Sequence, residues 1–224
     1  MSDQQFSNRA VQRRVKRSGS FYFLPVLLLL VALALLVWEV VRANLPPHVL
    51  VDLIFAPKTL GIGPAATLVA GLSALLLART QYAHVSRPYI SGHSQGWTGP
   101  RRRRAWSLHV HNVGAGVARV RQVKYAFNAS VLGAPIWVTA AEARDILRKA
   151  GLSVGIDFSL QEVSTGYALK PAMSASDGLQ LVTVSKRTAD RVRMFAVQIH
   201  FEDQLGDHYV WERNLATLFH LEHD

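Results

Sequence analysis

Two histidines on one predicted strand are the first residues whose spacing could support chemistry. His109 and His111 alternate with apolar residues, so both imidazoles would lie on one face of a β-strand and could share a metal ion. Other possible ligands gather around a later predicted hairpin: His200, Glu202, Asp203, Asp207 and His208. Neither group has the spacing of a zinc motif, and Asp203 and Asp207 supply too few oxygen ligands for calcium. We therefore expect no metal site and no cofactor.

Nucleophilic catalysis finds no support in the sequence. The chain of 224 residues has no cysteine, which removes thiol nucleophiles and cysteine metal sites. It has no G-x-S-x-G element and no phosphate-binding loop, and its Gly61-x-Gly63 pair precedes an apolar segment. We expect no catalytic residue and a protein that is not an enzyme.

Arginines are the remaining candidates for ligand binding. The net charge of +10 comes from two flanks, because residues 1–20 carry a net +4, residues 79–104 carry a net +6 and the other segments are neutral. Residues 105–224 balance 12 basic against 12 acidic residues, so nucleic acid is not the expected partner. Basic flanks favour anionic lipid headgroups, at about 1 kcal/mol per residue. The candidates for contact with a small anionic ligand are Arg101, Arg102, Arg103, Arg104, Arg119 and Arg121.

Two long apolar segments lie between these flanks. Residues 21–38 carry no charge and would span about 27 Å as a helix, close to the hydrocarbon thickness of a bilayer. We predict a transmembrane helix over 21–41, an extracytoplasmic linker over 42–58 and a second transmembrane helix over 59–78. Positive flanks favour the cytoplasm, so we expect both termini on the cytoplasmic side of a bacterial inner membrane. A signal peptide cleaved near Ala43 is the alternative.

Small residues recur at helical spacing along the second predicted helix. Such a stripe lets two membrane helices approach closely. Our first interpretation is packing against the first helix of the same chain, and the alternative is packing between protomers of an oligomer. The stripe consists of Gly63, Thr67, Ala70, Gly71, Ala74 and Ala78.

The chain beyond residue 104 predicts a β-rich domain. Apolar and polar residues alternate over 106–111, and a return strand over 117–127 follows a turn at Asn112, Gly114 and Gly116. Further strands are expected over 156–163, 179–185, 194–202, 208–213 and 215–221, with a hairpin loop at Asp203 and Gly206.

One helix is inserted among these strands. Thr139 and Glu142 have the spacing of a capping box, and Gly151 can end a helix, so we predict a helix over 139–150. The whole chain is therefore expected to be an α+β membrane protein, in which a transmembrane hairpin precedes a mainly antiparallel β-sandwich or small barrel. We divide it into a basic cytoplasmic tail (1–20), the hairpin, a basic juxtamembrane linker (79–104) and a soluble domain (105–224) that folds on its own.

Three motifs of this domain resemble those of immunoglobulin-like β-sandwiches. Asn112-x-Gly114-x-Gly116-x-Ala118 is similar to the N-x-G-x-G-x-A turn of CARDB-like adhesion modules and of uncharacterised bacterial two-helix membrane proteins. Leu169-Lys170-Pro171 resembles their L-x-P-G turn, with alanine in place of the glycine, and the segment 201–209 resembles their closing hairpin, Y-x-D-x-x-G-x-x-Y. The resemblance covers about residues 105–215 and implies a sandwich fold without implying a catalytic residue.

Two functions from different classes are consistent with these patterns. The first is a non-enzymatic binding module at the inner membrane, whose cytoplasmic sandwich recognises a protein or a small ligand. The second is a ligand-gated effector that oligomerises through its transmembrane helices and disrupts the membrane. Two membrane helices with a compact β-domain are similar in plan, though in no motif, to bacterial antiphage effectors gated by cyclic nucleotides.

Overall fold

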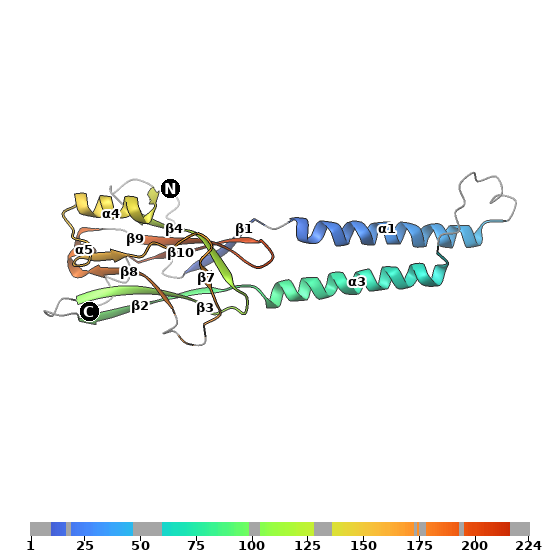
Figure 1. The fold of residues 1–224 in the computed structure, drawn as a ribbon, viewed down its shortest axis with the longest axis horizontal. Helices are drawn as coiled ribbons and strands as arrows, with labels where there is room; N and C mark the ends of the chain where they lie inside the picture. The colour runs from blue at the N-terminus through green and yellow to red at the C-terminus, as the bar shows by residue number, and fades with distance from the viewer. Residues whose placement is uncertain are drawn as a thin grey trace, which may run out of the picture. The chain divides into compact units, whose positions relative to one another are not determined.

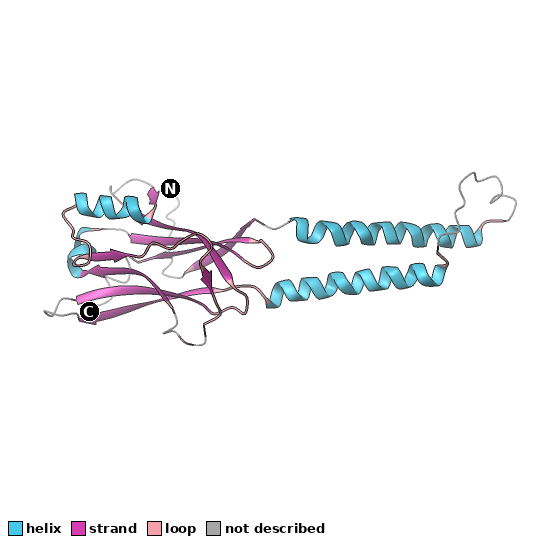
Figure 2. Cartoon of the chain, in the orientation of Figure 1, coloured by secondary structure: helices cyan, strands magenta, loops and turns pink. Residues whose placement is uncertain are grey.

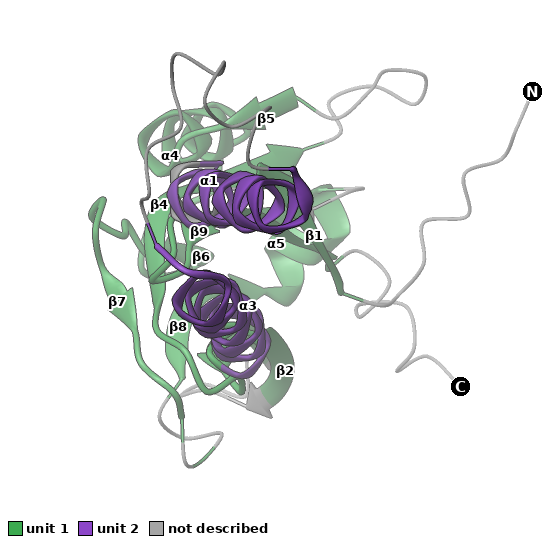
Figure 3. Ribbon diagram, turned by 90° about the vertical axis from the view of Figure 1, so that its right-hand side faces the viewer, with its two compact units in different colours: residues 1–17, 86–224 green, residues 18–85 purple. Residues whose placement is uncertain are grey.

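The chain folds into two compact units, which are described separately. The structure, a computed structural model, describes residues 10–16, 19–46, 60–98, 104–127, 136–172, 174, 178–192 and 195–215. One unit is helical and spans residues 18–85, and the other combines residues 1–17 with residues 86–224 (Figure 3). The second unit is therefore interrupted in sequence by the first.

The helical unit is a pair of long apolar helices. α1 (Gly19–Asn44) and α3 (Ile62–Val85) run side by side in opposite directions (Figure 1). Both are long and apolar enough to cross a membrane, by length and composition. The helices expected over 21–41 and 59–78 are thus present. α1 extends beyond its predicted range at both ends, whereas α3 begins later than predicted, at Ile62, and continues to Val85.

Glu39 joins the two helices at one end of the pair. Its side chain is almost fully buried, with 1% of its surface exposed. The Arg42 side chain donates to Glu39 Oε2 from Nε (3.2 Å) and from Nη2 (2.7 Å), and the Leu60 N–H donates to Oε1 (3.2 Å). Because the carboxylate is paired and hydrogen-bonded, its burial is compensated.

The second unit consists of two antiparallel sheets (Figure 2). The first sheet has the order β1-β10-β9-β4-β5, with β7 paired to β4. Its strands are β1 (Val11–Lys16), β10 (His208–Asn214), β9 (Phe195–Glu202), β4 (Ala118–Phe127), β5 (Ile136–Val138) and β7 (Ala168–Leu169). The second sheet has the order β2-β3-β8-β6. Its strands are β2 (Ile90–Thr98), β3 (Arg104–Asn112), β8 (Leu179–Ser185) and β6 (Phe158–Leu160).

One apolar core lies between the two sheets. Its largest fully buried side chains include Trp211, Tyr125 and Phe201 from the first sheet and Phe158 from the second. Each such side chain contributes roughly 1.5–3 kcal/mol when it leaves water. Among the described residues the two sheets share no strand pairing, which favours the sandwich over the small barrel.

The inserted helix α4 (Ala140–Lys149) begins where the sequence predicted. The Glu142 N–H donates to Thr139 Oγ1 (3.4 Å), and the Thr139 N–H donates to Glu142 Oε2 (2.8 Å), which completes the capping box. The Thr139 backbone and hydroxyl bonds lower the pKa of Glu142. α4 adds the buried side chains of Ala143 and Leu147 to the core, while a shorter helix, α5 (Lys186–Arg191), begins at the Ser185 cap.

Two segments taken for a tail and a linker are strands of this sandwich. Residues 11–16 form β1, which pairs with β10, and residues 90–98 form β2, which pairs with β3. Both are terminal strands of their sheets among the described residues, so they need little of the apolar alternation by which strands are predicted. The boundaries 1–20, 79–104 and 105–224 are therefore wrong as limits of the β-domain.

The other predicted strands are mostly confirmed. Residues 106–111, 117–127, 179–185, 194–202 and 208–213 correspond to β3, β4, β8, β9 and β10. The strand expected over 156–163 is reduced to β6, because a tight turn precedes Phe158 and Asp157 accepts a hydrogen bond from the Ser153 N–H (2.9 Å). The strand expected over 215–221 lies outside the described residues, apart from the buried Leu215.

Candidate functional site

The turn residues singled out in the sequence lie where the chain enters α1 and leaves α3. We call this region the junction, defined as the C-terminal end of β1, segment 86–89, turn 112–116 and loop 203–207. β1 ends at Lys16, shortly before α1, and segment 86–89 follows directly after α3. The junction is therefore the part of the β-unit that is covalently continuous with both apolar helices.

Asn112 is the centre of the junction. Its side chain is fully buried and uses its whole hydrogen-bonding capacity on the backbone. Nδ2 donates to the carbonyls of Gly116 (2.6 Å) and Leu169 (3.0 Å). Oδ1 accepts from the N–H groups of Tyr89 (3.1 Å) and Gly114 (3.0 Å). One amide thus joins the turn, β7 and the segment that leaves α3.

Gly114 and Gly116 are glycines because the chain from α3 passes directly over them. A Cβ atom at Gly116 would lie 1.6 Å from the Ser86 carbonyl oxygen, and one at Gly114 would lie 2.4 Å from the Arg87 oxygen and 2.4 Å from the Tyr89 nitrogen. Such contacts are sterically impossible, so any side chain here would displace segment 86–89. The N-x-G-x-G motif therefore holds the α3 exit as well as forming a turn.

The loop between β9 and β10 supplies the other side of the junction. Asp203 Oδ1 accepts from the N–H groups of Leu205 and Asp207 (2.9 Å each), and Tyr209 donates its hydroxyl hydrogen to Oδ2 (3.3 Å). Gly206 has a φ of +79°, a left-handed conformation that glycine adopts without strain. The carboxylate of Asp203 thus organises the loop and is not free to bind a cation.

Two arginines connect the chain on each side of the hairpin to this loop. Arg14 of β1 donates to Asp207 Oδ2 (3.2 Å), and the Arg87 guanidinium lies over the Tyr209 ring, 5.8 Å from its centroid. Burial and the nearby Asp203 charge raise the pKa of the Tyr209 hydroxyl, while Arg87 opposes the shift. The phenol therefore stays protonated at neutral pH and can donate to Asp203.

Side chains from the first sheet also hold the free edge of β2. Gln12 donates from Nε2 to the Pro88 carbonyl (3.0 Å) and accepts from the Ile90 N–H (2.9 Å). Arg213 of β10 donates to the Gly92 carbonyl. A Cβ at Gly92 would come within 2.8 Å of the Trp211 ring, so this glycine lets β2 approach the core closely.

The predicted ligand arginines do not form one site. Arg101, Arg102 and Arg103 lie outside the described residues, and Arg104 begins β3 at the end of that strand remote from Asn112. Eight residues of extended chain separate the two ends by roughly 26 Å. Arg119 and Arg121 lie on β4 shortly after the turn, so they belong to the junction end instead.

Arg121 is engaged with another strand. Its Nε donates to Glu202 Oε2 (2.8 Å), and its Nη2 donates to the same oxygen. Arg119 is exposed.

The structure adds one residue to the possible metal ligands and removes two. His93 of β2 lies opposite His109 in the strand pairing and contacts His111 diagonally. Asp203 and Asp207 are occupied by the loop and by Arg14. Within the described ranges, no group of three or more ligand-type side chains is arranged to hold a metal ion.

The small-residue stripe faces away from the other helix of the hairpin. Its members, Gly63, Thr67, Ala70, Gly71, Ala74 and Ala78, are all exposed, and a Cβ at Gly63 or Gly71 would meet nothing within 4 Å. The opposite face of α3, from Ala65 through Val69 and Leu72 to Leu76, is the one that is buried or half-buried. The interpretation that the stripe packs against the first helix is therefore wrong.

Sequence reasoning missed the side chains that bond across the junction and to the edge of β2. Gln12 and Arg14 lie on β1, Arg213 bonds to β2, and Arg87 lies in the segment before β2. Their contacts could not be predicted because β1 and β2 were not recognised as strands.

Comparisons with known proteins do not identify a family for this chain. No protein-family model matches the chain, and no curated protein matches it. One solved structure, described as the X-ray structure of Northeast Structural Genomics Consortium target SoR45, aligns with 64% of this chain and 96% of its own at 11% identity and a TM-score of 0.26. A similarity at this TM-score supports no argument about fold or function.

Proposed function

We propose that this protein is a non-enzymatic, membrane-anchored binding module. In this proposal α1 and α3 cross a bacterial inner membrane as a hairpin, and the sandwich lies on the cytoplasmic side, where it binds a protein or a small ligand. The resemblance to CARDB-like and related immunoglobulin-like modules remains part of this proposal. The observation that carries it is the insertion of the apolar hairpin between β1 and β2 of one folded unit.

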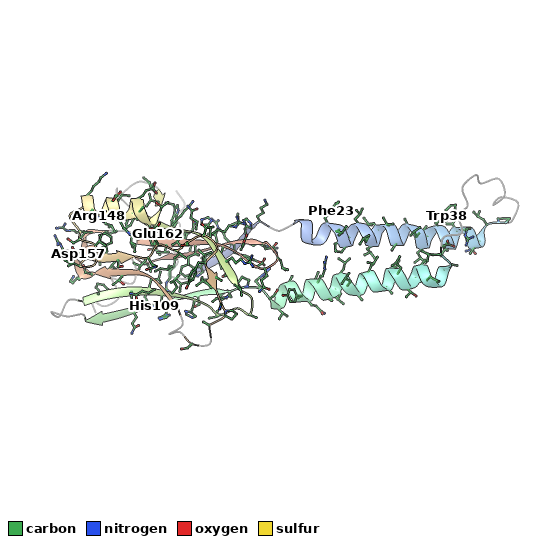
Figure 4. The ribbon with its side chains drawn as sticks, in the orientation of Figure 1. Phe23, Trp38, His109, Arg148, Asp157 and Glu162 are labelled. Atoms are coloured by element: carbon green, nitrogen blue, oxygen red, sulfur yellow. The ribbon has the colours of Figure 1, made fainter. Side chains whose placement is uncertain are left out.

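The exposure of the helices supports a membrane. Large apolar side chains such as Phe23 (68% exposed) and Leu77 (61% exposed) cover α1 and α3 (Figure 4 labels Phe23 and Trp38 on α1). A core helix of a soluble protein would bury such side chains, whereas an apolar surface of this extent needs lipid or protein to cover it.

The strand pairing supports the hairpin topology independently of charge. Because β1 precedes α1 and pairs with β10 after α3, the chain before and after the hairpin belongs to one unit. The two segments then lie on the same side of any membrane that the helices cross. Cleavage of a signal peptide near Ala43 would remove β1 from its sheet, which argues against that alternative.

The charges near the hairpin favour the cytoplasmic side for that unit. Arg13, Arg14 and Lys16 precede α1 closely, and Arg87 follows α3. Positively charged flanks are retained in the cytoplasm. Arg101–Arg104 count less for the orientation than the sequence suggested, because β2 separates them from α3 by the length of a strand.

Cysteine labelling tests the topology, and the chain has no cysteine to interfere. Val15→Cys, on an exposed position of β1, and Ala141→Cys, on an exposed position of α4, should both react with a membrane-impermeant maleimide only after the inner membrane is permeabilised. Pro46→Cys, between the two helices, serves as the matched control and should react in sealed cells. Labelling of Val15→Cys and Ala141→Cys from opposite sides would overturn the hairpin.

An oligomeric, membrane-disrupting effector is the second candidate. The observation that favours it is the exposed small-residue stripe of α3, which would let helices of neighbouring protomers approach closely. The gating ligand in this candidate is a small anionic molecule of the cyclic-nucleotide class, with Arg119 as its first contact.

Bulky substitutions on the stripe distinguish the two candidates. Gly71→Leu and Ala74→Leu should abolish ligand-dependent oligomers and any growth inhibition if the effector candidate is correct. Ser73→Leu is the control, since it makes a similar change outside the stripe. If crosslinked oligomers and growth are unchanged in all three variants, the effector candidate is wrong and the binding module is the remaining proposal.

A further inference from the structure

Three imidazoles meet on the face of the second sheet that points away from the core. His93 of β2 lies directly opposite His109 of β3, with ring centroids 5.2 Å apart and planes at 14°. His111, two residues along β3, has its ring centroid 5.4 Å from that of His93. Figure 4 labels His109 on this hairpin. We call these three residues the histidine cluster.

The surroundings of the cluster favour neutral imidazole rings. The Nδ1 atoms of His93 and His111 are buried and have no hydrogen-bond partner. An unprotonated nitrogen tolerates this position better than an N–H, because a buried donor without an acceptor forfeits its hydrogen bond to water. Protonation of either ring would place a proton on such a nitrogen.

The three strands β2, β3 and β8 supply no carboxylate that could compensate a positive charge here. β2, β3 and β8 contain no Asp or Glu, and their one charged residue is Arg104, at the far end of β3. Polar neighbours on the outer face include Ser107, whose Oγ lies 3.0 Å from His109 Nε2. By strand register, Ser91 and Gln95 of β2 and Gln180 and Thr183 of β8 lie on the same face.

The acidic side chains described around α5 are paired with basic side chains. In α5, which packs against β3 and β8, Lys186 pairs with Asp190, and Arg187 pairs with Asp157. Arg213 of β10 reaches β2 at Gly92, an inward-facing position. Among the residues that the structure describes, no carboxylate is therefore placed to compensate a second positive charge in the cluster.

We propose that the histidine cluster is an acid-sensitive latch, which holds edge strand β2 on β3 while the rings are neutral and loosens it when they take up protons. Burial, followed by the neighbouring His93, lowers the pKa of His109 and of His111. Since a histidine in an opened strand has its ordinary pKa near 6.5, opening is accompanied by proton uptake. The closed strand is fully stable above about pH 6.5 and loses stability as the pH falls below that value.

β2 is the strand through which this change reaches the junction. It is a terminal strand of its sheet among the described residues, and segment 86–89 connects it to α3. On the other side of β2 the side chains of Gln12 and Arg213 bond to its edge. Strand β2 is therefore the part of the second sheet that acid can loosen most easily.

Hydrogen exchange measured on the full chain in lipid nanodiscs tests the latch. After correction for the intrinsic pH dependence of exchange, the protection of a peptide covering residues 90–98 should fall severalfold between pH 7.5 and 5.5, because opening returns the lowered pKa values of His109 and His111 to their ordinary range. Protection of a peptide covering β6 should stay constant over the same range.

Ring-preserving variants separate the latch from general acid sensitivity. The double variant His109→Phe/His111→Phe keeps an aromatic ring at both positions but removes the two imidazoles whose pKa burial lowers, so it should reduce the change in β2 protection to less than about twofold. If that variant fails to fold, His111→Phe gives the same comparison. His200→Gln is the matched control, because burial also lowers the pKa of His200, on β9, outside the cluster.

Two results would overturn the proposal. One is a wild-type β2 whose corrected protection is the same at both pH values. The other is a fall in protection that is as large in His109→Phe/His111→Phe and in His111→Phe as in the wild type. The readout needs no bound ligand and does not depend on which side of a membrane the β-unit faces, so it is independent of the proposed function.

Discussion

At the scale of single residues, one amide fixes the junction. Asn112 makes four hydrogen bonds to backbone groups from three separate segments, and none of its polar atoms is left without a partner. Only asparagine has two donors and an acceptor on so short a side chain, which explains why this residue type starts the N-x-G-x-G turn. The N-x-G-x-G motif, from which the fold was predicted, thus also joins the turn to β7 and to segment 86–89.

Replacement of Asn112 should be among the most destabilising single changes. Asn112→Ala leaves two buried carbonyls and two N–H groups without partners, which we expect to lower the free energy of unfolding by at least about 2 kcal/mol. The shift of the urea midpoint, followed by tryptophan fluorescence in a Trp38→Phe background, measures it.

The control for this change is Gln95→Ala, an exposed position on β2. It should stay within about 0.5 kcal/mol of the wild type. Equal midpoints for Asn112→Ala and Gln95→Ala would show that the four bonds contribute nothing measurable.

At the scale of elements, the edges of the sandwich are secured by side chains. β1 pairs only with β10 among the described strands, and Gln12 extends from it to the backbone on both sides of Tyr89. α4 is secured in a different way, by the reciprocal bonds of Thr139 and Glu142 at its N-terminus. These contacts decide whether β2 and α4 stay in place, and each can be tested alone.

Gln12→Ala should detach the beginning of β2 from the first sheet. It removes one donor and one acceptor across the gap between the sheets, so we expect a loss of roughly 1–3 kcal/mol and faster hydrogen exchange at Ile90. Arg13→Ala, at the exposed neighbouring position of β1, is the matched control and should change neither quantity. Identical exchange at Ile90 in the two variants would argue against this bridge.

Thr139→Ala should weaken the start of α4 by about 1 kcal/mol, the usual contribution of a side chain at an N-cap. Glu142→Gln keeps an oxygen that can accept from the Thr139 N–H, and it should cost less. Hydrogen exchange in the first turn of α4 measures both effects. A larger loss for Glu142→Gln than for Thr139→Ala would contradict this account of the cap.

At the scale of the whole molecule, the sandwich is assembled from both ends of the chain. Its first sheet needs β1, and its second sheet needs β2, so residues 105–224 lack one edge strand of each sheet. The expectation that 105–224 folds on its own therefore has to be revised. Such a fragment would expose Trp211, which β2 covers at Gly92, to water.

A shortened chain that keeps both edge strands tests this revision. We expect the fragment 105–224 to be aggregated or unfolded, as judged by gel filtration and far-UV circular dichroism. A chain in which a flexible Gly/Ser linker replaces residues 18–85 should be monomeric and β-rich, because it retains β1 and β2. A well-folded 105–224 fragment with the same thermal midpoint would show that the two edge strands are dispensable.

Prediction from sequence succeeded where local patterns carry the structure. The two helices follow from uncharged runs, and α4 follows from Thr139 and Glu142, whose bonds depend only on neighbouring residues. β3 and β4 follow from alternation of apolar residues. β1 and β2 could not be predicted in this way, because their pairing is decided by partners far away in the chain and their outer edges do not need apolar side chains.

The candidate site was predictable in its parts but not in its assembly. Asn112, Gly114, Gly116, Asp203 and Gly206 stood out as turn residues. Their proximity to segment 86–89 and to Arg14 depends on the return of β10 to β1, which no local pattern encodes. The histidine cluster was missed for the same reason, since His93 appeared to lie in a linker.

The pairing of β1 with β10 also determines when the sandwich can be completed during biosynthesis. Arg14 and Asp207, which bond across this pairing, are 193 residues apart in the chain. At a synthesis rate of about 5–20 residues per second, roughly 10–40 s pass between their emergence from the ribosome. During that interval both apolar helices are synthesised, and β1 remains unpaired. In the proposed membrane topology, insertion of α1 and α3 therefore begins before the sandwich is complete, and an error in insertion would leave the sandwich with an unpaired edge.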